Sequence, residues 1–187
     1  MNYAATSIAD DLKYELVDGT EFMMSPPKIN HQRIGGNLLG IIGGYLHGKR
    51  HKVFYSASVI FDAKNHFIPD ILVICDKNKI KPDAIYGAPD FVVEILSPST
   101  KKRDLGVKKD TYEKYGVKEY WIINPQDRSI TAYLLQDGKF VLDNVYFDLT
   151  EEDWNLLDDK EQAEQKLTLK ISLYDDLEIS VKDVFEE

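Results

Sequence analysis

Two carboxylates and one lysine in the middle of the chain could together support metal-assisted chemistry. Asp70 comes directly before an apolar run, Glu94 lies inside another, and Lys108 follows in a segment of helical pattern. A carboxylate among apolar residues is costly unless it is protonated, paired or bound to a cation. If the two acids converge, a hard cation such as Mg²⁺ or Mn²⁺ relieves their repulsion. Such a cation polarises a phosphate and lowers the pKa of a bound water, while a lysine stabilises negative charge.

Each of these residues also has a purely structural interpretation. Asp70 could simply end a strand, and Glu94 could be a core glutamate paired with Lys108. Either acid alone is more readily explained in this way, and only the ordered spacing of all three favours a site. Because side chains alternate along a strand, Glu94 lies on the face opposite Val93 and Ile95. The site therefore requires Asp70 to occupy the same face as Glu94.

Hydrophobic patterning predicts the elements that must position these residues. The expected strands cover 14–17, 21–24, 53–61, 71–75, 91–96, 119–123, 130–135, 139–142, 167–173 and 178–181. The continuous apolar runs 71–75 and 91–96 are typical of strands buried on both faces. Asp18-Gly19 predicts a hairpin turn between the first two strands. Helical patterns cover 30–47 and 104–115.

The two helical segments carry further information. The first contains five glycines, which weaken a helix but let its backbone lie close to a sheet, and Asn30 is expected to cap it. In the second, a spacing of four places Asp104, Lys108 and Tyr112 on one face. Gly116 is the expected C-cap of that second helix.

The composition indicates a soluble globular domain. Its 187 residues suit one domain spanning 1–187, with residues 1–12 expected to be disordered and an acidic insert near 150–165. Cys75 is the only cysteine, which excludes an internal disulfide and a cysteine-rich zinc site. We see no apolar run long enough to cross a membrane and no secretory signal, so we expect a reducing cytoplasm.

The charge is distributed unevenly. A net charge of −9 argues against a protein that coats DNA non-specifically, because phosphate binding requires clustered Lys and Arg. Acids crowd into 148–164, whereas seven lysines and arginines fall within 101–118, next to the candidate site. The local charge therefore still permits a nucleic-acid partner.

The chain resembles the restriction endonuclease family often called Uma-two, within the PD-(D/E)xK nuclease superfamily. The resemblance covers nearly the whole chain apart from the acidic insert. The residues that carry it are Tyr14-Glu15-Leu16-Val17-Asp18-Gly19, Pro69-Asp70, Phe91-Val92-Val93-Glu94-Ile95-Leu96-Ser97-Pro98-Ser99-Thr100, Asp104, Lys108, Tyr112 and Gly116-Val117.

This resemblance implies roles for individual residues. Asp70 and Glu94 would be the metal-binding acids, and the main-chain carbonyl of Ile95 an additional ligand. The superfamily has a lysine two residues after the glutamate, where this chain has Leu96. The lysine of the family lies instead on the following helix, where this chain has Lys108.

Other residues keep two interpretations. In many nucleases of the superfamily an earlier acid joins the site, which implies a catalytic role for Glu15; a strand glutamate facing solvent is the equal alternative. His31 could touch a phosphate or aid proton transfer, although a structural histidine explains it more readily. Lys109 is the second choice for the lysine. Arg103 and Lys101 could contact phosphate or form a solvated face.

We therefore expect an α/β fold with a restriction-endonuclease-like core, a mixed central β-sheet flanked by helices. The expected function is Mg²⁺- or Mn²⁺-dependent hydrolysis of DNA phosphodiester bonds by a homodimer, with Asp70, Glu94, Lys108 and Glu15 in the site. Two rivals stay open. One is a catalytically inactive module that binds metal or nucleic acid, and the other is a protein-interaction module that uses the acidic insert.

Overall fold

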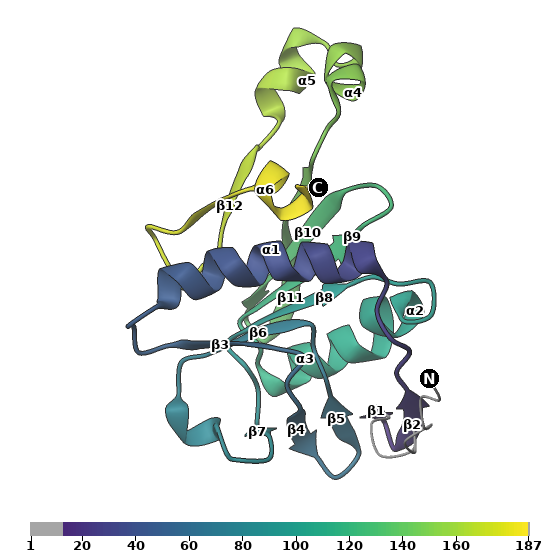
Figure 1. The fold of residues 1–187 in the computed structure, drawn as a ribbon, viewed down its shortest axis with the longest axis vertical. Helices are drawn as coiled ribbons and strands as arrows, with labels where there is room; N and C mark the ends of the chain where they lie inside the picture. Colours follow the sequence, from purple (N-terminus) through teal and green to yellow (C-terminus); the bar gives the residue numbers. More distant parts are fainter. Residues whose placement is uncertain (1–12, 187) are drawn as a thin grey trace, which may run out of the picture.

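The computed structural model describes residues 13–186, so the expectation for residues 1–12 lies outside it. A six-stranded mixed sheet forms the centre, in the order β11-β10-β9-β8-β6-β3 (Figure 1). Its strands are β3 (Lys52–Tyr55), β6 (Ile71–Ile74), β8 (Phe91–Ile95), β9 (Glu119–Asn124), β10 (Ser129–Gln136) and β11 (Lys139–Phe147). β8 and β9 run parallel, and the other neighbouring pairs run antiparallel.

A second sheet lies at one end of the central one, in the order β2-β1-β5-β4-β7. Its strands are β1 (Tyr14–Val17), β2 (Thr20–Met23), β4 (Val59–Asp62), β5 (Asn65–Phe67) and β7 (Ile85–Tyr86). The expected hairpin between β1 and β2 is confirmed, since Asp18 and Gly19 both have positive φ, 48° and 79°. β12 (Thr168–Lys170) and β13 (Glu178–Ser180) form a separate ribbon.

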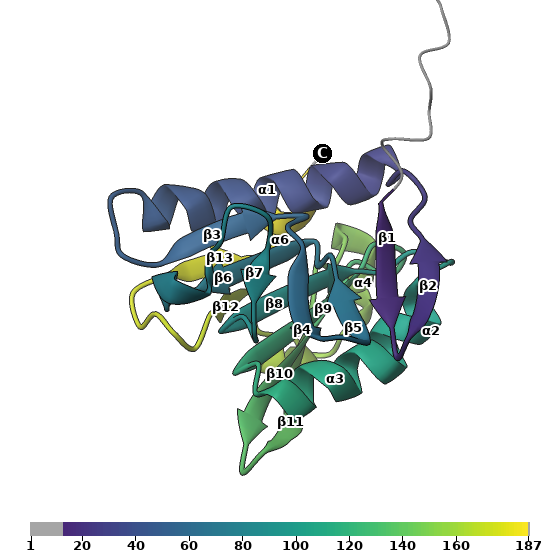
Figure 2. The same ribbon diagram turned by 90° about the horizontal axis from the view of Figure 1, so that it is seen from below.

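Helices cover both faces of the central sheet (Figure 2). On one face lies α1 (Ile29–Leu46), against which α6 (Val181–Phe185) packs. On the other lie the consecutive segments α2 (Lys101–Arg103), η3 (Asp104–Lys108) and α3 (Lys109–Tyr115). A short 3-10 turn, η2 (Lys77–Lys79), joins β6 to β7. The expected mixed α/β architecture is therefore the one observed.

The central strands divide the core into two clusters. On one face, alternate residues of β6 and β8 pack against α1: Ile71, Val73, Phe91, Val93 and Ile95. The α1 residues that they contact form its apolar stripe: Ile34, Leu38 and Ile42. On the other face, the intervening residues Leu72, Ile74 and Val92 point toward α3. They pack in one cluster with the rings of Tyr112 and Tyr120. Burial on both faces explains why these strands are continuously apolar.

The structure corrects three expectations about local elements. The run 53–61 is not one strand, because β3 and β4 belong to different sheets and Ser56 between them has a φ of 48°. Asn30 does not cap α1; the N-cap position is Lys28, and the Asn30 side chain accepts a hydrogen bond from Arg33. The helix over 104–115 is interrupted, because Gly106 has non-helical backbone angles and a π-helical segment results.

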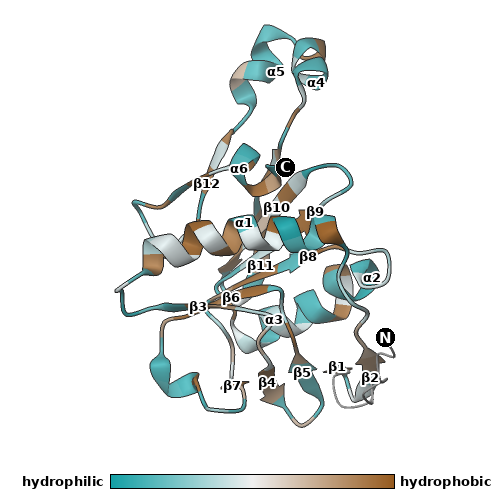
Figure 3. Ribbon diagram, viewed as in Figure 1, coloured by the Kyte–Doolittle hydropathy of each residue, from teal (hydrophilic) through white to brown (hydrophobic). Residues whose placement is uncertain are grey.

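The acidic insert near 150–165 forms two short helices. α4 (Glu151–Leu156) and α5 (Asp159–Glu164) project away from both sheets (Figure 1). Capping boxes at Thr150 and Asp158 stabilise their first turns. Within 151–164 no residue is buried, and the hydropathy colouring is largely hydrophilic (Figure 3).

Across residues 13–186, no helix combines the length and the apolar character needed to span a bilayer.

Candidate active site

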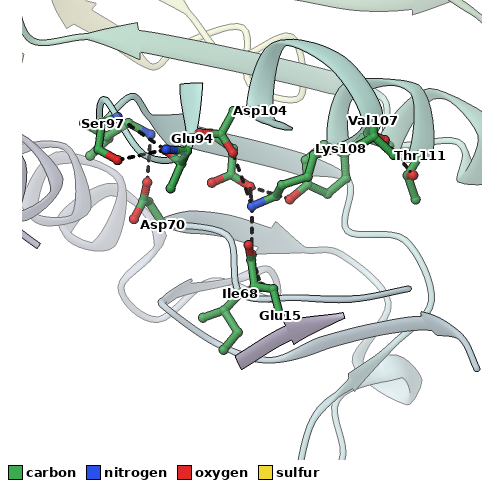
Figure 4. Close-up of polar contacts among 12 residues, drawn as sticks. Glu15, Ile68, Asp70, Glu94, Ser97, Asp104, Val107, Lys108 and Thr111 are labelled. Atoms are coloured by element: carbon green, nitrogen blue, oxygen red, sulfur yellow. Dashed lines mark hydrogen bonds and ion pairs between the residues drawn. The ribbon is translucent and has the colours of Figure 1, made fainter. Parts of the chain in front are cut away.

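Lys108 lies at the centre of a buried cluster of carboxylates (Figure 4). Its Nζ is 2.6 Å from Glu94 Oε1, 2.8 Å from Glu15 Oε1 and 3.6 Å from Asp104 Oδ1. The exposed fraction of each of these four side chains is 5% or less. Three carboxyl groups and one ammonium group are therefore held together in a region almost fully buried from solvent.

Elements that are far apart in the sequence bring these groups together. Glu94 points from β8 toward the face that η3 and α3 cover, because its neighbours Val93 and Ile95 pack under α1. Lys108 and Asp104 both come from η3. Glu15 comes from β1, which reaches the site by pairing with β5. Its Oε1 also accepts the Ile68 amide at 2.9 Å, so the position of Glu15 is fixed from two sides.

Asp70 lies at the edge of this cluster. In the antiparallel register of β6 and β8, Ile71 pairs with Val93, so the next pair outward is Asp70 with Glu94. Asp70 Oδ2 accepts the Ile95 amide at 2.7 Å. The same oxygen lies 3.3 Å from His31 Nε2, which comes from the first turn of α1. Asp70 and Glu94 are therefore neighbours across the two strands, and Asp70 is the more exposed.

Burial and the neighbouring charges shift the pKa values of Glu94, Asp104 and Lys108. Burial, together with Asp104, Asp70 and Glu15, raises the pKa of Glu94 well above its usual value, although Lys108 opposes the shift. The pKa of Asp104 is raised for the same leading reason. Burial alone would lower the pKa of Lys108, but the three carboxylates outweigh it and raise that pKa. The lysine therefore stays protonated, and Glu94 and Asp104 hold protons more readily than exposed carboxyl groups do.

Tyr112 adds a neutral hydrogen-bond donor to the cluster. Its hydroxyl donates to Glu94 Oε1 at 2.5 Å, and its ring packs with Leu72 and Val92 on the face of the sheet that α3 covers. Burial, followed by the charge of Glu94, raises the pKa of Tyr112 well above its usual value, so the hydroxyl keeps its proton. Tyr112 therefore orients Glu94 without adding charge.

Known proteins resemble this chain over most of its length. Residues 2–173 match the model of the family described as "Uma2: Putative restriction endonuclease". The chain belongs to the Uma2 family. It is 30% identical to "Uncharacterized protein slr1290" of Synechocystis sp. over 160 residues, which cover 84% of this chain and 77% of that protein.

A solved structure shares the fold of this Uma2 chain. It is the crystal structure of "a putative nuclease belonging to DUF820" from Anabaena variabilis, with a TM-score of 0.69 and 21% identity. The match covers 92% of this chain and 89% of that chain. At this identity the likeness shows the fold alone, and the roles of individual residues depend on the geometry described above.

The donor chemistry of the Uma2 site suits a hard divalent cation. Asp104 Oδ1 is buried and accepts no hydrogen bond, although Lys108 lies 3.6 Å away. Three carboxylates, at 15, 94 and 104, surround one charged lysine, and the Asp70 carboxylate lies beside Glu94 across the strands. Oxygen ligands are those that Mg²⁺ prefers. Within 13–186, however, no three or more His, Cys, Asp or Glu side chains are arranged to hold a metal ion. The residues therefore suit a cation in type and charge, but the described side chains are not arranged around one.

The other residues considered from the sequence occupy definite places. Lys109 points away from the cluster, with its Nζ 3.7 Å from the Tyr133 ring centre. Ser97 and Ser99 hydrogen-bond to each other and shape the turn after β8. His31 contacts Asp70, and its Nδ1 is buried without a hydrogen-bond partner among residues 13–186.

Sequence reasoning left two members of the cluster without a role. Asp104 and Tyr112 were expected only to share a helix face with Lys108. In the structure one approaches Lys108 and the other hydrogen-bonds to Glu94. Their spacing of four from Lys108 was the available signal, because residues four apart on a helix lie close together.

Proposed function

We propose that this chain hydrolyses phosphodiester bonds in DNA with a divalent cation, Mg²⁺ or Mn²⁺, in the manner of PD-(D/E)xK nucleases. The observation that carries the proposal is the buried cluster in which Glu94, Glu15 and Asp104 surround Lys108 beside Asp70. Acids and a lysine held at such depth are rarely needed for stability alone, because desolvation is expensive. Membership of the Uma2 family supports the same reaction class.

The residues divide into ligands and groups that act on the substrate. Asp70, Glu94 and the main-chain carbonyl of Ile95 would hold the cation. When bound, the cation polarises the phosphate and lowers the pKa of a water molecule. Lys108 supplies a fixed positive charge next to Glu94, where it stabilises the attacking hydroxide or the charge that develops on the phosphate.

Two further residues keep this arrangement in place. Glu15 binds Lys108 and the Ile68 amide, so it orients the ammonium group instead of facing solvent. Tyr112 holds one oxygen of Glu94. We therefore assign Glu15 to the site as a residue that positions Lys108, and Tyr112 as one that positions Glu94.

We propose DNA as the partner for two reasons. The family model carries the description of a restriction endonuclease, and the lysines and arginines of residues 101–118 lie next to the site. Two sites acting together would cut both strands of a duplex in one binding event, so we also propose a homodimer. Sedimentation velocity at micromolar protein concentration measures the oligomeric state. A single species with the mass of the monomer would contradict the dimer.

The test of the function compares variants that keep size but lose one charge. We expect the wild-type chain with Mg²⁺ or Mn²⁺ to nick plasmid DNA, or to cut single-stranded, duplex or branched oligonucleotides. Asp70→Asn and Glu94→Gln should each lower the rate by about a hundredfold or more, because each removes one charged ligand. Asp90→Asn is the matched control, since Asp90 is buried at the opposite end of β8 and should keep full activity.

Calorimetric titration with Mn²⁺ separates binding from cleavage. We expect the wild type and Asp90→Asn to bind Mn²⁺, and the two site variants to lose that binding. Mn²⁺ binding without cleavage of any substrate would favour an inactive metal-binding module. Neither binding nor cleavage by the wild type would contradict the proposal.

A further inference from the structure

We infer that Arg103 forms a phosphate-binding subsite beside the acid cluster, which holds a backbone phosphate of the nucleic acid next to the one that is cleaved. This inference rests on the proposed function. It concerns a residue that contacts none of the carboxylates around Lys108, and it assigns to that residue the chemical class of its ligand, a phosphodiester.

Arg103 lies close to the acid cluster although it takes no part in it. Its guanidinium carbon is 4.4 Å from the centre of the Phe22 ring. Phe22 is the cross-strand partner of Glu15 in the β1–β2 hairpin, and such partners lie on one face of a sheet. Arg103 also directly precedes Asp104 in the chain. The guanidinium is therefore held at the margin of the cluster from two directions.

The nearby acids are all engaged elsewhere. Glu15, Glu94 and Asp104 surround Lys108, and Asp70 accepts the Ile95 amide, as the contact lines in Figure 4 show for these residues. Among residues 13–186 no carboxylate forms an ion pair with Arg103, and its Nε is buried without a hydrogen-bond acceptor. A cation this close to several carboxylates, yet paired with none of them, retains its donors for a ligand.

The chemistry of the side chain identifies that ligand. A guanidinium presents five N–H donors in a planar fork that matches two oxygens of a phosphate. Stacking on Phe22 fixes the plane of the fork in advance, so less conformational freedom is lost on binding. Lys101 and Lys102 precede Arg103 and are exposed, which makes this edge locally positive. A polyanion that crosses this edge would enter the site beside Lys108.

The experiment measures DNA binding without cleavage. All proteins keep the acids of the site intact, and Ca²⁺ replaces Mg²⁺ so that DNA is bound without being cleaved. Fluorescence anisotropy with a labelled duplex and a labelled single strand is recorded between about 50 and 300 mM salt. Arg103→Gln is compared with Arg50→Gln, which removes the same charge from an exposed arginine. The start of α1 lies near Asp70 through His31, and Arg50 follows the other end of this helix, which is about 27 Å long.

We expect Arg103→Gln to weaken DNA binding by about tenfold and to reduce the slope of log affinity against log salt by about one. Arg50→Gln should stay within about twofold of its parent. Arg103→Lys keeps the charge but not the planar fork, so it should keep most of the salt slope while losing part of the affinity. Thermal unfolding of each variant establishes that the protein is folded.

Two results would overturn the inference. If Arg103→Gln and Arg103→Lys both bind DNA as tightly as Arg50→Gln, Arg103 only packs on Phe22. If the parent with wild-type site residues binds neither DNA in Ca²⁺, the proposed function itself fails, and the subsite fails with it. Should Arg103→Gln not fold, Arg103→Lys decides, because unchanged affinity and slope together contradict a bidentate contact.

Discussion

At the scale of single residues, Lys108 determines whether three buried acids are tolerable. Glu15, Glu94 and Asp104 have almost no contact with solvent, and the lysine is the one permanent cation within ion-pair distance of all of them among residues 13–186. Breaking a buried cluster by removing one partner leaves uncompensated charge, which costs more than the cluster contributes. The site should therefore be sensitive to loss of the lysine before any substrate is present.

We predict that Lys108→Met lowers the free energy of unfolding by about 3 kcal/mol, measured by urea denaturation at pH 7. Lys109→Met is the matched control, because the neighbouring lysine lies over Tyr133 outside the cluster, and it should cost less than about 1 kcal/mol. The double variant Glu15→Gln with Lys108→Met should be more stable than Lys108→Met alone, since one unpaired acid is removed. Equal losses for the two lysine variants would contradict the prediction.

A second residue-scale prediction concerns Asp90, far from the site. Burial alone would raise the pKa of Asp90, but the ion pair with Lys118 at 2.8 Å and the Cys75 amide at 2.8 Å lower it below 3.8. A carboxyl group whose native pKa is depressed stabilises the fold above the pKa of the unfolded chain. That stabilisation is lost as pH falls through the lower native pKa.

We therefore expect Asp90→Ala to lower the free energy of unfolding by about 1–2 kcal/mol at pH 7 and pH 5, and the gap from wild type to narrow toward pH 3. Asp90→Asn should cost less, because it still offers an acceptor to Cys75. Urea denaturation at the three pH values measures the gap. A gap that stays constant or widens at pH 3 would show that the Asp90 charge does not stabilise the native state.

At the scale of elements, the glycines of α1 have unequal roles. A Cβ at Gly35 would lie 2.9 Å from a Tyr55 ring carbon and 3.4 Å from Ile95 Cδ1. The distance to the Tyr55 carbon is too short, so the Tyr55 ring would have to shift. A Cβ at Gly36 would meet nothing within 4 Å. The expectation that the glycines let the helix lie close to the sheet is therefore confirmed at Gly35 and does not apply to Gly36.

This pair gives a prediction of opposite sign. Gly36→Ala should raise the free energy of unfolding by about 0.5–1 kcal/mol, because alanine is the better helix former. Gly35→Ala should leave the protein at least about 1 kcal/mol less stable than Gly36→Ala, since the added methyl group displaces Tyr55. Thermal and urea unfolding of both variants measure the difference. Equal stabilities would mean that Tyr55 moves aside at no cost.

At the scale of the whole molecule, the acidic excursion is separate from both core clusters. Residues 151–164 hold seven acids and one lysine, so their removal takes away a net charge of −6 and leaves −3 of the original −9. None of these residues is buried. The excursion thus contributes charge to the molecule without contributing to its core.

Replacing 151–164 by a short Gly-Ser linker should change the free energy of unfolding by less than about 1 kcal/mol. DNA affinity at low salt should rise by roughly two- to fivefold, because less negative charge opposes the approach of a polyanion. The gain should disappear near 0.5 M salt as screening increases. A loss of folding would show that the excursion stabilises the core, and a gain that persists at high salt would contradict the electrostatic explanation.

The sequence alone determined the first hairpin, the two central strands β6 and β8, and the acids at or beside those two strands. Asp18-Gly19 requires positive φ at two positions, which specifies a hairpin locally. The apolar runs that became β6 and β8 are long enough to show burial on both faces, and Asp70 and Glu94 are recognisable because charge is costly there. These are local properties, so an isolated sequence expresses them.

Only the tertiary structure decided which groups meet. Glu15 reaches Lys108 because β1 pairs with β5, and Arg103 stacks on Phe22 because the same hairpin lies beside η3. The split of 53–61 between two sheets likewise depends on which strands it pairs with. Apolar periodicity records how much of a residue is buried but not what covers it. The partners of Lys108 and Arg103, and with them the chemistry of the site, are therefore set by contacts between segments distant in the chain.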